Sequence, residues 1–273
     1  MSEPVTVRLV VSDVDGTLVD KDKQVTPGTV AAVERLREAG VEFTVISARP
    51  RSGILPVLDA LELDVPVAAF NGGIVFTRDG QEQVHHLVDA EVARGALALA
   101  ADAAVDVWVF ADDQWFATTG EGAHAESERV SANQEPAIRE RFDELTDRVD
   151  KITFVSDEPQ VLRDLHARIE ERFEGRATVA QSQTYYLDVT ALAANKGEGV
   201  AALAKALGVP LDQTAAIGDQ ANDLPMLKRV ALPIVMGNAP DAMREGAAHV
   251  TRGNDADGVA HAIDTIILKG NSQ

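Results

Sequence analysis

Apolar runs and amphipathic segments alternate regularly along the first part of the chain. Residues 7–12 form a nearly continuous apolar run rich in β-branched side chains, which is typical of a strand buried in a parallel sheet. Thr26 and Pro27 supply an N-cap and a proline at the first helical position, and Gly40 ends that helix. Two more strands and a helix are predicted next, at residues 41–46, 67–70 and 54–61. This β-α-β-α-β order predicts a parallel, doubly wound sheet.

The pattern changes after residue 70. Arg78-Asp79-Gly80 lies between two short strand-like segments and predicts a hairpin, since glycine is favoured where φ is positive. A second hairpin is predicted around residues 111–113. The segments between and beyond them read as a helix at 91–101, a polar stretch at 120–136, a strand at 151–155, a helix at 159–173, and strands at 177–180 and 185–189. Hairpins mixed with helices favour an inserted α+β unit.

From Asn195 onward the α/β alternation returns. A helix is predicted at residues 197–207 and ends at Gly208. The remaining elements are a strand at 214–217, a short helix at 223–228, a strand at 232–236, a helix after Pro240, a short strand at 249–251 and a helix at 258–268. We therefore predict an α/β protein. Its core would be a doubly wound, Rossmann-like parallel sheet made by residues 1–83 and 190–273, with an α+β cap at residues 84–189.

Composition narrows the possible chemistry. The 273 residues include no cysteine, which excludes disulfides, thiolate nucleophiles and cysteine metal sites. A bound metal would then be held by oxygen or histidine ligands, and oxygen ligands favour Mg²⁺. The formal net charge of −19 predicts no nucleic-acid partner and no anionic membrane partner. Without a long apolar run or a signal-like N-terminus, we expect a soluble, cytoplasmic protein.

Two acidic clusters follow predicted strands. Asp13 and Asp15 come directly after the first strand, where an open α/β sheet binds its ligands. One carboxylate of such a pair can attack while the other handles protons, although Asp-Gly also makes an ordinary turn. Asp219 and Asp223 follow the strand at 214–217 and could complete an oxygen-ligand site, although either Asp219 or Asn222 could simply cap a helix. Two acidic clusters at strand ends are harder to dismiss than one.

Two further residues gain meaning only beside these clusters. Lys196 stands at the start of a predicted helix, where the dipole disfavours a cation. By itself it reads as a solvated surface lysine. Ser47 follows the second strand and by itself reads as a loop residue or a cap.

These features, in this order, resemble the haloacid dehalogenase-like (HAD) superfamily, and most closely its Cof-type, or type IIB, phosphatases. The resemblance covers nearly the whole chain. It rests on DVDGTL from Asp13, the Asn71-Gly72-Gly73 turn, Lys196-Gly197, GDQANDLPML from Gly218, MGNAP from Met236 and Asp257-Gly258-Val259. The cap of that family is inserted at the point where, in this chain, the alternation of strands and helices gives way to hairpins.

The resemblance implies a role for each matching residue. Asp13 would attack phosphorus to form an aspartyl-phosphate, and Asp15 would protonate the leaving oxygen and then activate water. The Asp13 carboxylate, the Asp15 backbone carbonyl and Asp219 would bind Mg²⁺, with Asp223 in support. The catalytic set would be completed by Ser47 and Lys196. The residues implied at the phosphate or substrate are Ser47, Arg49, Asn71, Gly72, Lys196 and Asn222. The family often has Gly where this chain has Ala48, so the role of Arg49 is a hypothesis.

The substrate implied is a small phosphorylated metabolite, with a sugar phosphate as the default. A phosphosugar mutase would use the same aspartyl-phosphate, and a non-catalytic phosphosugar-binding regulator would keep the fold alone. A dehalogenase is disfavoured because its chemistry needs neither Asp15 nor Mg²⁺. The cap aromatics Trp108, Trp115, Tyr185 and Tyr186 are predicted to be core rather than a sugar platform, and Asp188 is a weak candidate for substrate contact. A monomer or a small homo-oligomer is expected.

Overall fold

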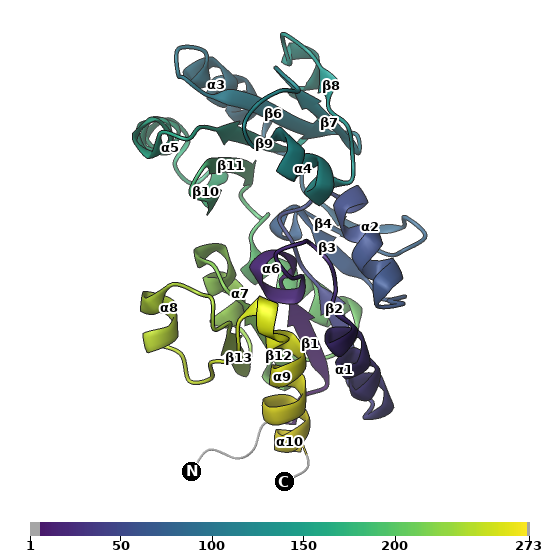
Figure 1. Cartoon of the computed structure of the whole chain (residues 1–273). Helices are drawn as coiled ribbons and strands as arrows, with labels where there is room; N and C mark the ends of the chain where they lie inside the picture. The colour runs from purple at the N-terminus through teal and green to yellow at the C-terminus, as the bar shows by residue number, and fades with distance from the viewer. Residues whose placement is uncertain (1–5, 272–273) are drawn as a thin grey trace.

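The core of the molecule is a parallel sheet. The computed structural model describes residues 6–271. Its four-stranded sheet has the order β13-β12-β1-β2, and all of its pairs are parallel. The strands are β1 (Leu9–Ser12), β2 (Glu42–Val45), β12 (Thr214–Gly218) and β13 (Leu232–Val235). Figure 1 shows them in the lower half of the molecule, near both chain ends. The prediction of an α/β fold with a parallel, doubly wound core is confirmed.

Helices cover both faces of this sheet because successive strand residues point to opposite sides. Val10 packs with Val33 of α1, whereas Leu9 and Val11 pack with Leu203 of α6. Such burial on both sides explains why the first strand is a continuous apolar run. The helices of the core are α1 (Pro27–Glu38), α2 (Arg51–Ala60), α6 (Lys196–Ala206), α7 (Leu224–Leu227), α8 (Asp241–Glu245), α9 (Gly258–Ala262) and α10 (Leu268–Asn271). The strand predicted at residues 249–251 is reduced to one bridge between Val250 and Val235.

The first predicted hairpin extends the core. It consists of β4 (Ile74–Phe76) and β5 (Glu82–His85), and β4 also pairs with β3 (Val67–Ala69). A bridge between Ile46 and Ala68 joins β3 to the strand before it. The predicted boundary between core and cap at residues 83 and 84 therefore falls inside β5. The predicted boundary at residues 189 and 190 falls inside β11. We propose that the inserted cap is the part of the chain between β5 and α6.

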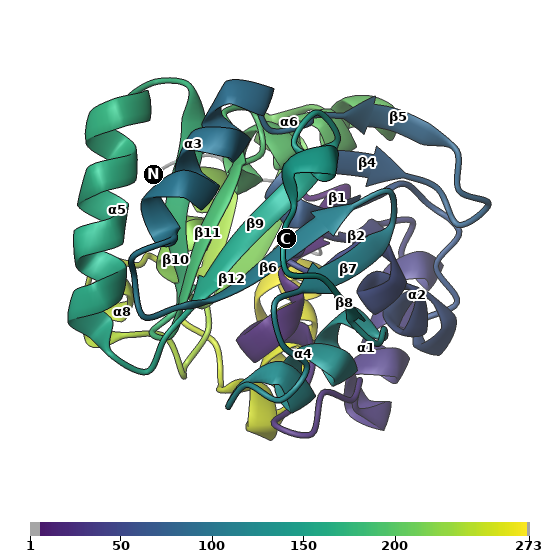
Figure 2. The same ribbon diagram turned by 90° about the horizontal axis from the view of Figure 1, so that it is seen from above.

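The insert forms a second sheet. Its six strands have the order β10-β11-β9-β6-β7-β8. They are β6 (Asp106–Ala111), β7 (Gln114–Ala117), β8 (Ala137–Ile138), β9 (Val149–Val155), β10 (Ala177–Gln183) and β11 (Tyr186–Ala191). Helices α3 (Ala90–Ala100) and α5 (Pro159–Phe173) lie side by side on one face of this sheet, as Figure 2 shows. The other face is turned toward the core.

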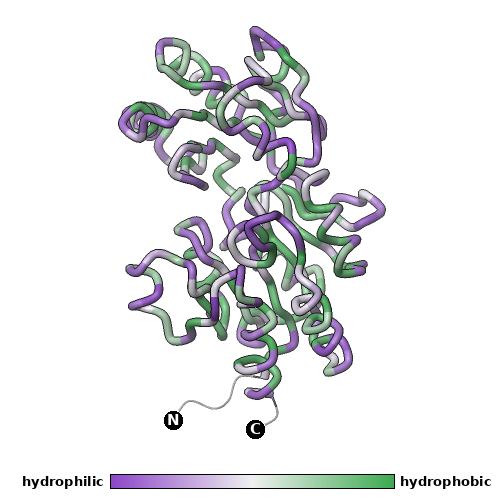
Figure 3. The backbone as a smooth tube through the Cα atoms, in the orientation of Figure 1, coloured by the Kyte–Doolittle hydropathy of each residue, from purple (hydrophilic) through white to green (hydrophobic). Residues whose placement is uncertain are grey.

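Strand alternation gives the second sheet one apolar and one mixed face. Ile152 and Phe154 of β9 pack under α3 and α5. The alternate residues Lys151 and Thr153 point the other way and are buried between the sheet and the core. In Figure 3 the strands at the centre of the core are mainly hydrophobic, whereas the connecting loops are mainly hydrophilic. The cap therefore presents buried polar side chains toward the carboxyl ends of the core strands.

The short helix of the cap that lines the cavity was not predicted. Helix α4 (Ala125–Ala132) lies within the stretch recognised only as polar. Its buried positions are Ala125, Glu128 and Ala132, so the helix has hardly any apolar periodicity. It packs against α2 of the core at Gly53, where a Cβ would lie 2.0 Å from the Ser131 carbonyl oxygen. Tertiary contact between small residues, rather than amphipathicity, holds this helix. Among residues 6–271, no helix has both the length and the apolar character needed to cross a membrane.

Candidate active site

The carboxyl ends of neighbouring parallel strands bring the predicted residues together. Asp13 follows β1, Ser47 follows β2, and Asp219 follows β12, at one edge of the core sheet. A cavity of about 140 Å³ opens there between core and cap. Its walls are formed by Asp13, Asp15, Lys23, Ser47, Ala48, Arg49, Ser127, Glu128, Ser131, Lys151, Ser182, Gln183, Tyr185, Tyr186, Gln220 and Asn222. The two sheets therefore share one polar cavity.

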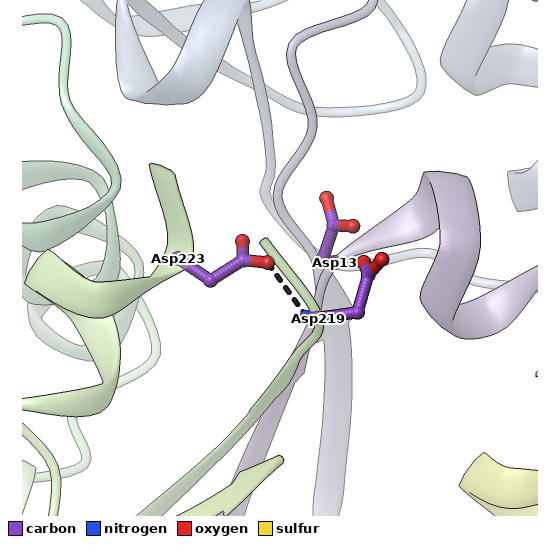
Figure 4. Close-up of side chains that lie close together, drawn as sticks. All are labelled: Asp13, Asp219 and Asp223. Carbon is purple, nitrogen blue, oxygen red and sulfur yellow. Dashed lines mark hydrogen bonds between the residues drawn. The ribbon is translucent and has the colours of Figure 1, made fainter. Parts of the chain in front are cut away.

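Three buried carboxylates form a cluster at the floor of this site. Asp13, Asp219 and Asp223 each offer an oxygen, and these oxygens all lie within 4.8 Å of one another. Figure 4 shows the three side chains converging from β1 and from the segment after β12. Burial raises the pKa of Asp13, and burial together with Asp223 raises the pKa of Asp219 to about 6. The donor set is all oxygen and has excess negative charge, which fits a hard divalent cation such as Mg²⁺.

Lys196 is the cation within this cluster. It is the first residue of α6, whose N-cap Asn195 accepts a hydrogen bond from the Glu198 amide. Its buried Nζ lies 2.5 Å from Asp13 Oδ1 and 2.5 Å from Asp223 Oδ1. Burial alone would lower the pKa of Lys196, but the two carboxylates outweigh it and raise the pKa. The cost of a cation at a helix N-terminus is thus offset by two anions.

Asp223 is fixed from both sides. Its Oδ2 accepts hydrogen bonds from the amides of Asp219 (2.8 Å) and Gln220 (2.9 Å), while its Oδ1 faces Lys196. Gly218 makes room for it, since a Cβ there would lie 2.5 Å from Asp223 Cγ. Asp223 therefore orients the backbone that carries Asp219 as well as balancing the charge of Lys196.

Asp219 is aimed by the turn after β1. Thr17 Oγ1 donates to Asp219 Oδ1 at 2.9 Å, and Gln220 Nε2 donates to Oδ2 at 3.1 Å. Gly16 allows this approach because its φ is +79° and a Cβ there would lie 2.5 Å from Asp219 Oδ2. The DVDGT motif thus places Asp13 and also shapes the pocket that receives Asp219.

A substitution at Gly16 should therefore disturb metal binding. We expect Gly16→Ala to force Asp219 aside and to raise the Mg²⁺ concentration needed for half-maximal thermal stabilisation at least about tenfold. Gly80→Ala is the matched control, because Gly80 has a φ of +84° but no atom within 4 Å of the position that a Cβ would occupy. Both variants carry the left-handed backbone penalty of about 1–2 kcal/mol. Equal Mg²⁺ titrations for the two variants would contradict a role for Asp219 in metal binding.

Asp15 is held away from the carboxylate cluster by two cations. Arg49 donates to both of its oxygens, from Nε at 2.7 Å and from a terminal nitrogen at 2.8 Å, and Lys23 Nζ donates at 2.6 Å. Burial would raise the pKa of Asp15, but the hydrogen bonds and charges of Arg49 and Lys23 hold it well below the ordinary value. The Asp15 carboxylate is therefore ionised and does not contribute to the oxygen cluster.

Some of the other predicted residues line the cavity, and others do not. Ser47 and Asn222 border it, and the Asn222 amide donates to Asn71 Oδ1 at 3.4 Å. The backbone amide of Asn71 donates to the Ser47 carbonyl at 2.7 Å, which joins Asn71 to the loop that carries Ser47. Gly72 does not border the cavity. It has a φ of +99° and packs on α6, where a Cβ would lie 2.7 Å from Gly199 Cα.

Sequence reasoning did not single out several cavity residues. Lys23 comes from the loop after the first turn, Glu128 from α4 and Lys151 from β9. Strand alternation carried a usable signal for Lys151, since it is a polar residue inside an apolar strand pattern. Glu128 had no comparable signal because its helix was not predicted.

The cap aromatics divide into two groups. Trp108 and Trp115 are almost fully buried and pack on each other with ring centroids 5.1 Å apart, as predicted for core residues. Tyr185 and Tyr186 also border the cavity, and Tyr186 is buried and packs on Trp108 with ring centroids 5.3 Å apart, as predicted for a core residue. Asp188 lies behind the cavity wall, where it accepts a hydrogen bond from Thr153 Oγ1 at 2.7 Å.

Comparison with known proteins places this geometry in context. Residues 10–263 match the sequence profile of a family described as haloacid dehalogenase-like hydrolase. A protein of Streptococcus pyogenes serotype M6, whose name classes it provisionally as a phosphatase, is 31% identical over 96% of this chain and 99% of its own length. The crystal structure of a haloacid dehalogenase-like hydrolase from Bacteroides thetaiotaomicron is similar with a TM-score of 0.82 and 27% identity, covering 96% of this chain and 100% of the other. A HAD subclass IIB sugar phosphatase shares the fold with a TM-score of 0.82 and 21% identity, covering 94% and 98%.

Proposed function

This chain belongs to the haloacid dehalogenase-like hydrolase family, and we propose that it is a Mg²⁺-dependent phosphatase that forms an aspartyl-phosphate on Asp13. The observation that carries the proposal is the placement of Asp13. Its carboxylate lies at a strand end, borders the cavity, is paired with buried Lys196, and shares that cavity with Asp15. A nucleophile, a proton carrier and a charge-neutralising group thus meet at one point.

The reaction proceeds in two displacements. An Asp13 carboxylate oxygen attacks phosphorus and forms a P–O bond, while the bond between phosphorus and the leaving alcohol breaks with its electron pair on the alcohol oxygen. A proton from Asp15 neutralises that oxygen. In the second displacement, Asp15 accepts a proton from water as the water oxygen attacks phosphorus, which restores Asp13 and releases phosphate. Lys196 stays beside Asp13 throughout and offsets charge there.

The metal would be held by the carboxylates of Asp13 and Asp219, by the Asp15 backbone carbonyl and, in support, by Asp223. When bound, it supplies positive charge that lowers repulsion between the carboxylates and the phosphoryl oxygens. Ser47, which borders the cavity, would donate to a phosphoryl oxygen, and Asn222, which also borders it, would contact the phosphate.

Arg49 and Lys23 link substrate binding to the protonation state of the Asp15 carboxylate. Both cations are engaged with Asp15 in the free protein, so its carboxylate has no proton to donate. An incoming phosphate offers them a stronger anionic partner on the same side of the cavity. As they turn toward the phosphate, Asp15 loses the contacts that keep it ionised and becomes able to carry a proton.

We propose a sugar phosphate as the substrate. The cavity is lined by many polar groups and two tyrosines, and the neighbour of the same fold described as a sugar phosphatase is consistent with this class. The partner would then be a small phosphorylated metabolite. A phosphosugar mutase would use the same first displacement but pass the phosphoryl group to a second hydroxyl.

Phosphate release from sugar phosphates and p-nitrophenyl phosphate tests the proposal. We expect release with Mg²⁺, a loss on the order of 10³-fold in excess EDTA, and recovery when Mg²⁺ is restored. Ca²⁺ should restore little, because it prefers more ligands at longer distances than Mg²⁺ does. Release that persists in EDTA would contradict metal dependence. An isomerised sugar phosphate without free phosphate would identify a mutase, and binding without turnover would identify a regulator.

A further inference from the structure

The cavity has a second polar end, formed by the cap. Opposite Asp13 and Asp15 stand Glu128 from α4 and Lys151 from β9. Hydroxyl groups surround them, supplied by Ser127, Ser131, Ser182 and Tyr185. Because the phosphate must reach Asp13, this end would face the leaving alcohol.

Glu128 is a buried carboxylate that lacks hydrogen-bond donors. Its side chain borders the cavity, and the residue is only 7% exposed. Within residues 6–271, no side chain or amide donates a hydrogen bond to its carboxylate, and it forms no salt bridge. Burial raises the pKa of Glu128, with the charge of Lys151 opposing that rise. A carboxylate that faces the cavity without a donor from the protein is suited to donors that arrive with a ligand.

Lys151 shares its charge with a second carboxylate of the cap. Its Nζ donates to the Ala48 carbonyl at 3.2 Å, lies 3.9 Å from Asp188 Oδ1, and lies 4.7 Å from the centre of the Phe110 ring. The single positive charge of Lys151 thus stands beside two buried carboxylates, Glu128 and Asp188. A second anionic group on the leaving alcohol would therefore meet an excess of negative charge at this end of the cavity.

The size of the cavity is compatible with a small ligand. Its volume of about 140 Å³ is close to the roughly 150 Å³ of an engineered cavity that holds one benzene molecule. Tyr185 closes one side, with its ring stacked on His124 at a centroid distance of 3.8 Å. The space beside Glu128 is therefore suited to a compact leaving alcohol.

From these contacts we infer that Glu128 accepts hydrogen bonds from hydroxyl groups of the leaving alcohol and selects neutral, polyhydroxylated monophosphates over bisphosphates. The inference rests on the proposed phosphatase function and adds a residue that determines specificity. Selection arises from two effects of one carboxylate. It attracts neutral hydroxyl donors and repels a second phosphate.

Glu128→Gln tests this inference because the amide keeps the shape and removes the charge. The measurement is kcat/KM for glucose 6-phosphate, fructose 1,6-bisphosphate and p-nitrophenyl phosphate, which lacks hydroxyl donors on its leaving group. We expect the ratio of kcat/KM for glucose 6-phosphate to that for p-nitrophenyl phosphate to fall about 10- to 100-fold. The ratio of kcat/KM for fructose 1,6-bisphosphate to that for p-nitrophenyl phosphate should rise. Glu126→Gln is the matched control, since Glu126 lies on the same helix with its side chain 81% exposed, and it should leave both ratios unchanged.

Other outcomes separate this inference from the proposed function. Equal losses with all three substrates would indicate a structural role for Glu128 and overturn the inference. A wild-type preference for bisphosphates, for planar aromatic monophosphates or for aminoalkyl phosphates would also overturn it. If the wild-type protein hydrolyses none of these compounds, the phosphatase proposal fails, and calorimetric binding of glucose 6-phosphate by Asp13→Asn with and without Glu128→Gln still tests the role of Glu128. A difference below threefold between those two proteins would count against it.

Discussion

Asp13→Asn is expected to reduce phosphate release by a factor on the order of 10⁴ or more, because the amide cannot attack phosphorus to form an acyl phosphate. The substitution is isosteric. Lys196 keeps its second partner, Asp223 Oδ1, at 2.5 Å. One of three crowded carboxylates is removed, so the variant without metal should melt at a temperature equal to or above that of the wild type.

The measurement is single-turnover and steady-state phosphate release, together with trapping of phosphorylated protein. Wild type should show an acid-stable, hydroxylamine-sensitive phosphoryl group during turnover, and Asp13→Asn should show none. Asp22→Asn is a suitable control, since Asp22 lies in the nearby loop with its side chain 70% exposed. Activity above a tenth of the wild-type value in Asp13→Asn would exclude Asp13 as the nucleophile.

Much of the core was predictable because its elements are locally determined. Thr26 caps α1 as predicted, accepting a hydrogen bond from the Thr29 amide at 3.2 Å, and Gly40 follows the helix with a φ of +73°. In the cap, helix α5 likewise has the predicted bounds, since its apolar residues recur at helical spacing. The parallel order of β1 and β12 follows from two similar strand-turn-helix segments far apart in the sequence.

The sequence was less informative where tertiary contacts decide the structure. Helix α4 depends on close packing against Gly53, which no local pattern encodes. The pairing of Asp15 with Arg49 and Lys23 was also unforeseen, because it joins three separate loops. Motif spacing brought Asp13, Asp219 and Asp223 to one edge, yet it gave no information on the cap side of the cavity, where Glu128 lies. Residues set by motifs were therefore predictable, and residues set by docking of the cap were not.

Lys196→Met is expected to lower both stability and activity, and the two losses should respond differently to a second substitution. Methionine keeps the unbranched apolar stem but leaves Asp13 and Asp223 buried without their shared cation. Removing one partner of a buried ion pair costs about 3–5 kcal/mol. For a chain of this size, that corresponds to a melting temperature lower by roughly 10 °C. Activity should fall about 10²- to 10³-fold through lost charge stabilisation.

Neutral pH is the right condition for this comparison. The folded pKa of Lys196 is raised, so its contribution to stability is fully present below the ordinary lysine pKa of 10.5 and is lost only as the pH rises through the higher folded value. Lys205→Met provides the control, because Lys205 is exposed near the other end of the same helix. It should change neither the melting temperature nor the rate appreciably.

The second substitution separates charge balance from catalysis. Adding Asp223→Asn to Lys196→Met removes one of the two uncompensated carboxylates and should recover about half of the lost stability. Activity should stay low, since the cation beside Asp13 is still missing and Asp223 no longer supports the metal site. The measurements are melting curves in EDTA and kcat/KM in Mg²⁺. They are made on the wild type, Lys196→Met, the double variant and the Lys205→Met control. If activity recovers along with stability, Lys196 acts only by holding the fold. If stability does not recover, the two carboxylates are not what Lys196 neutralises.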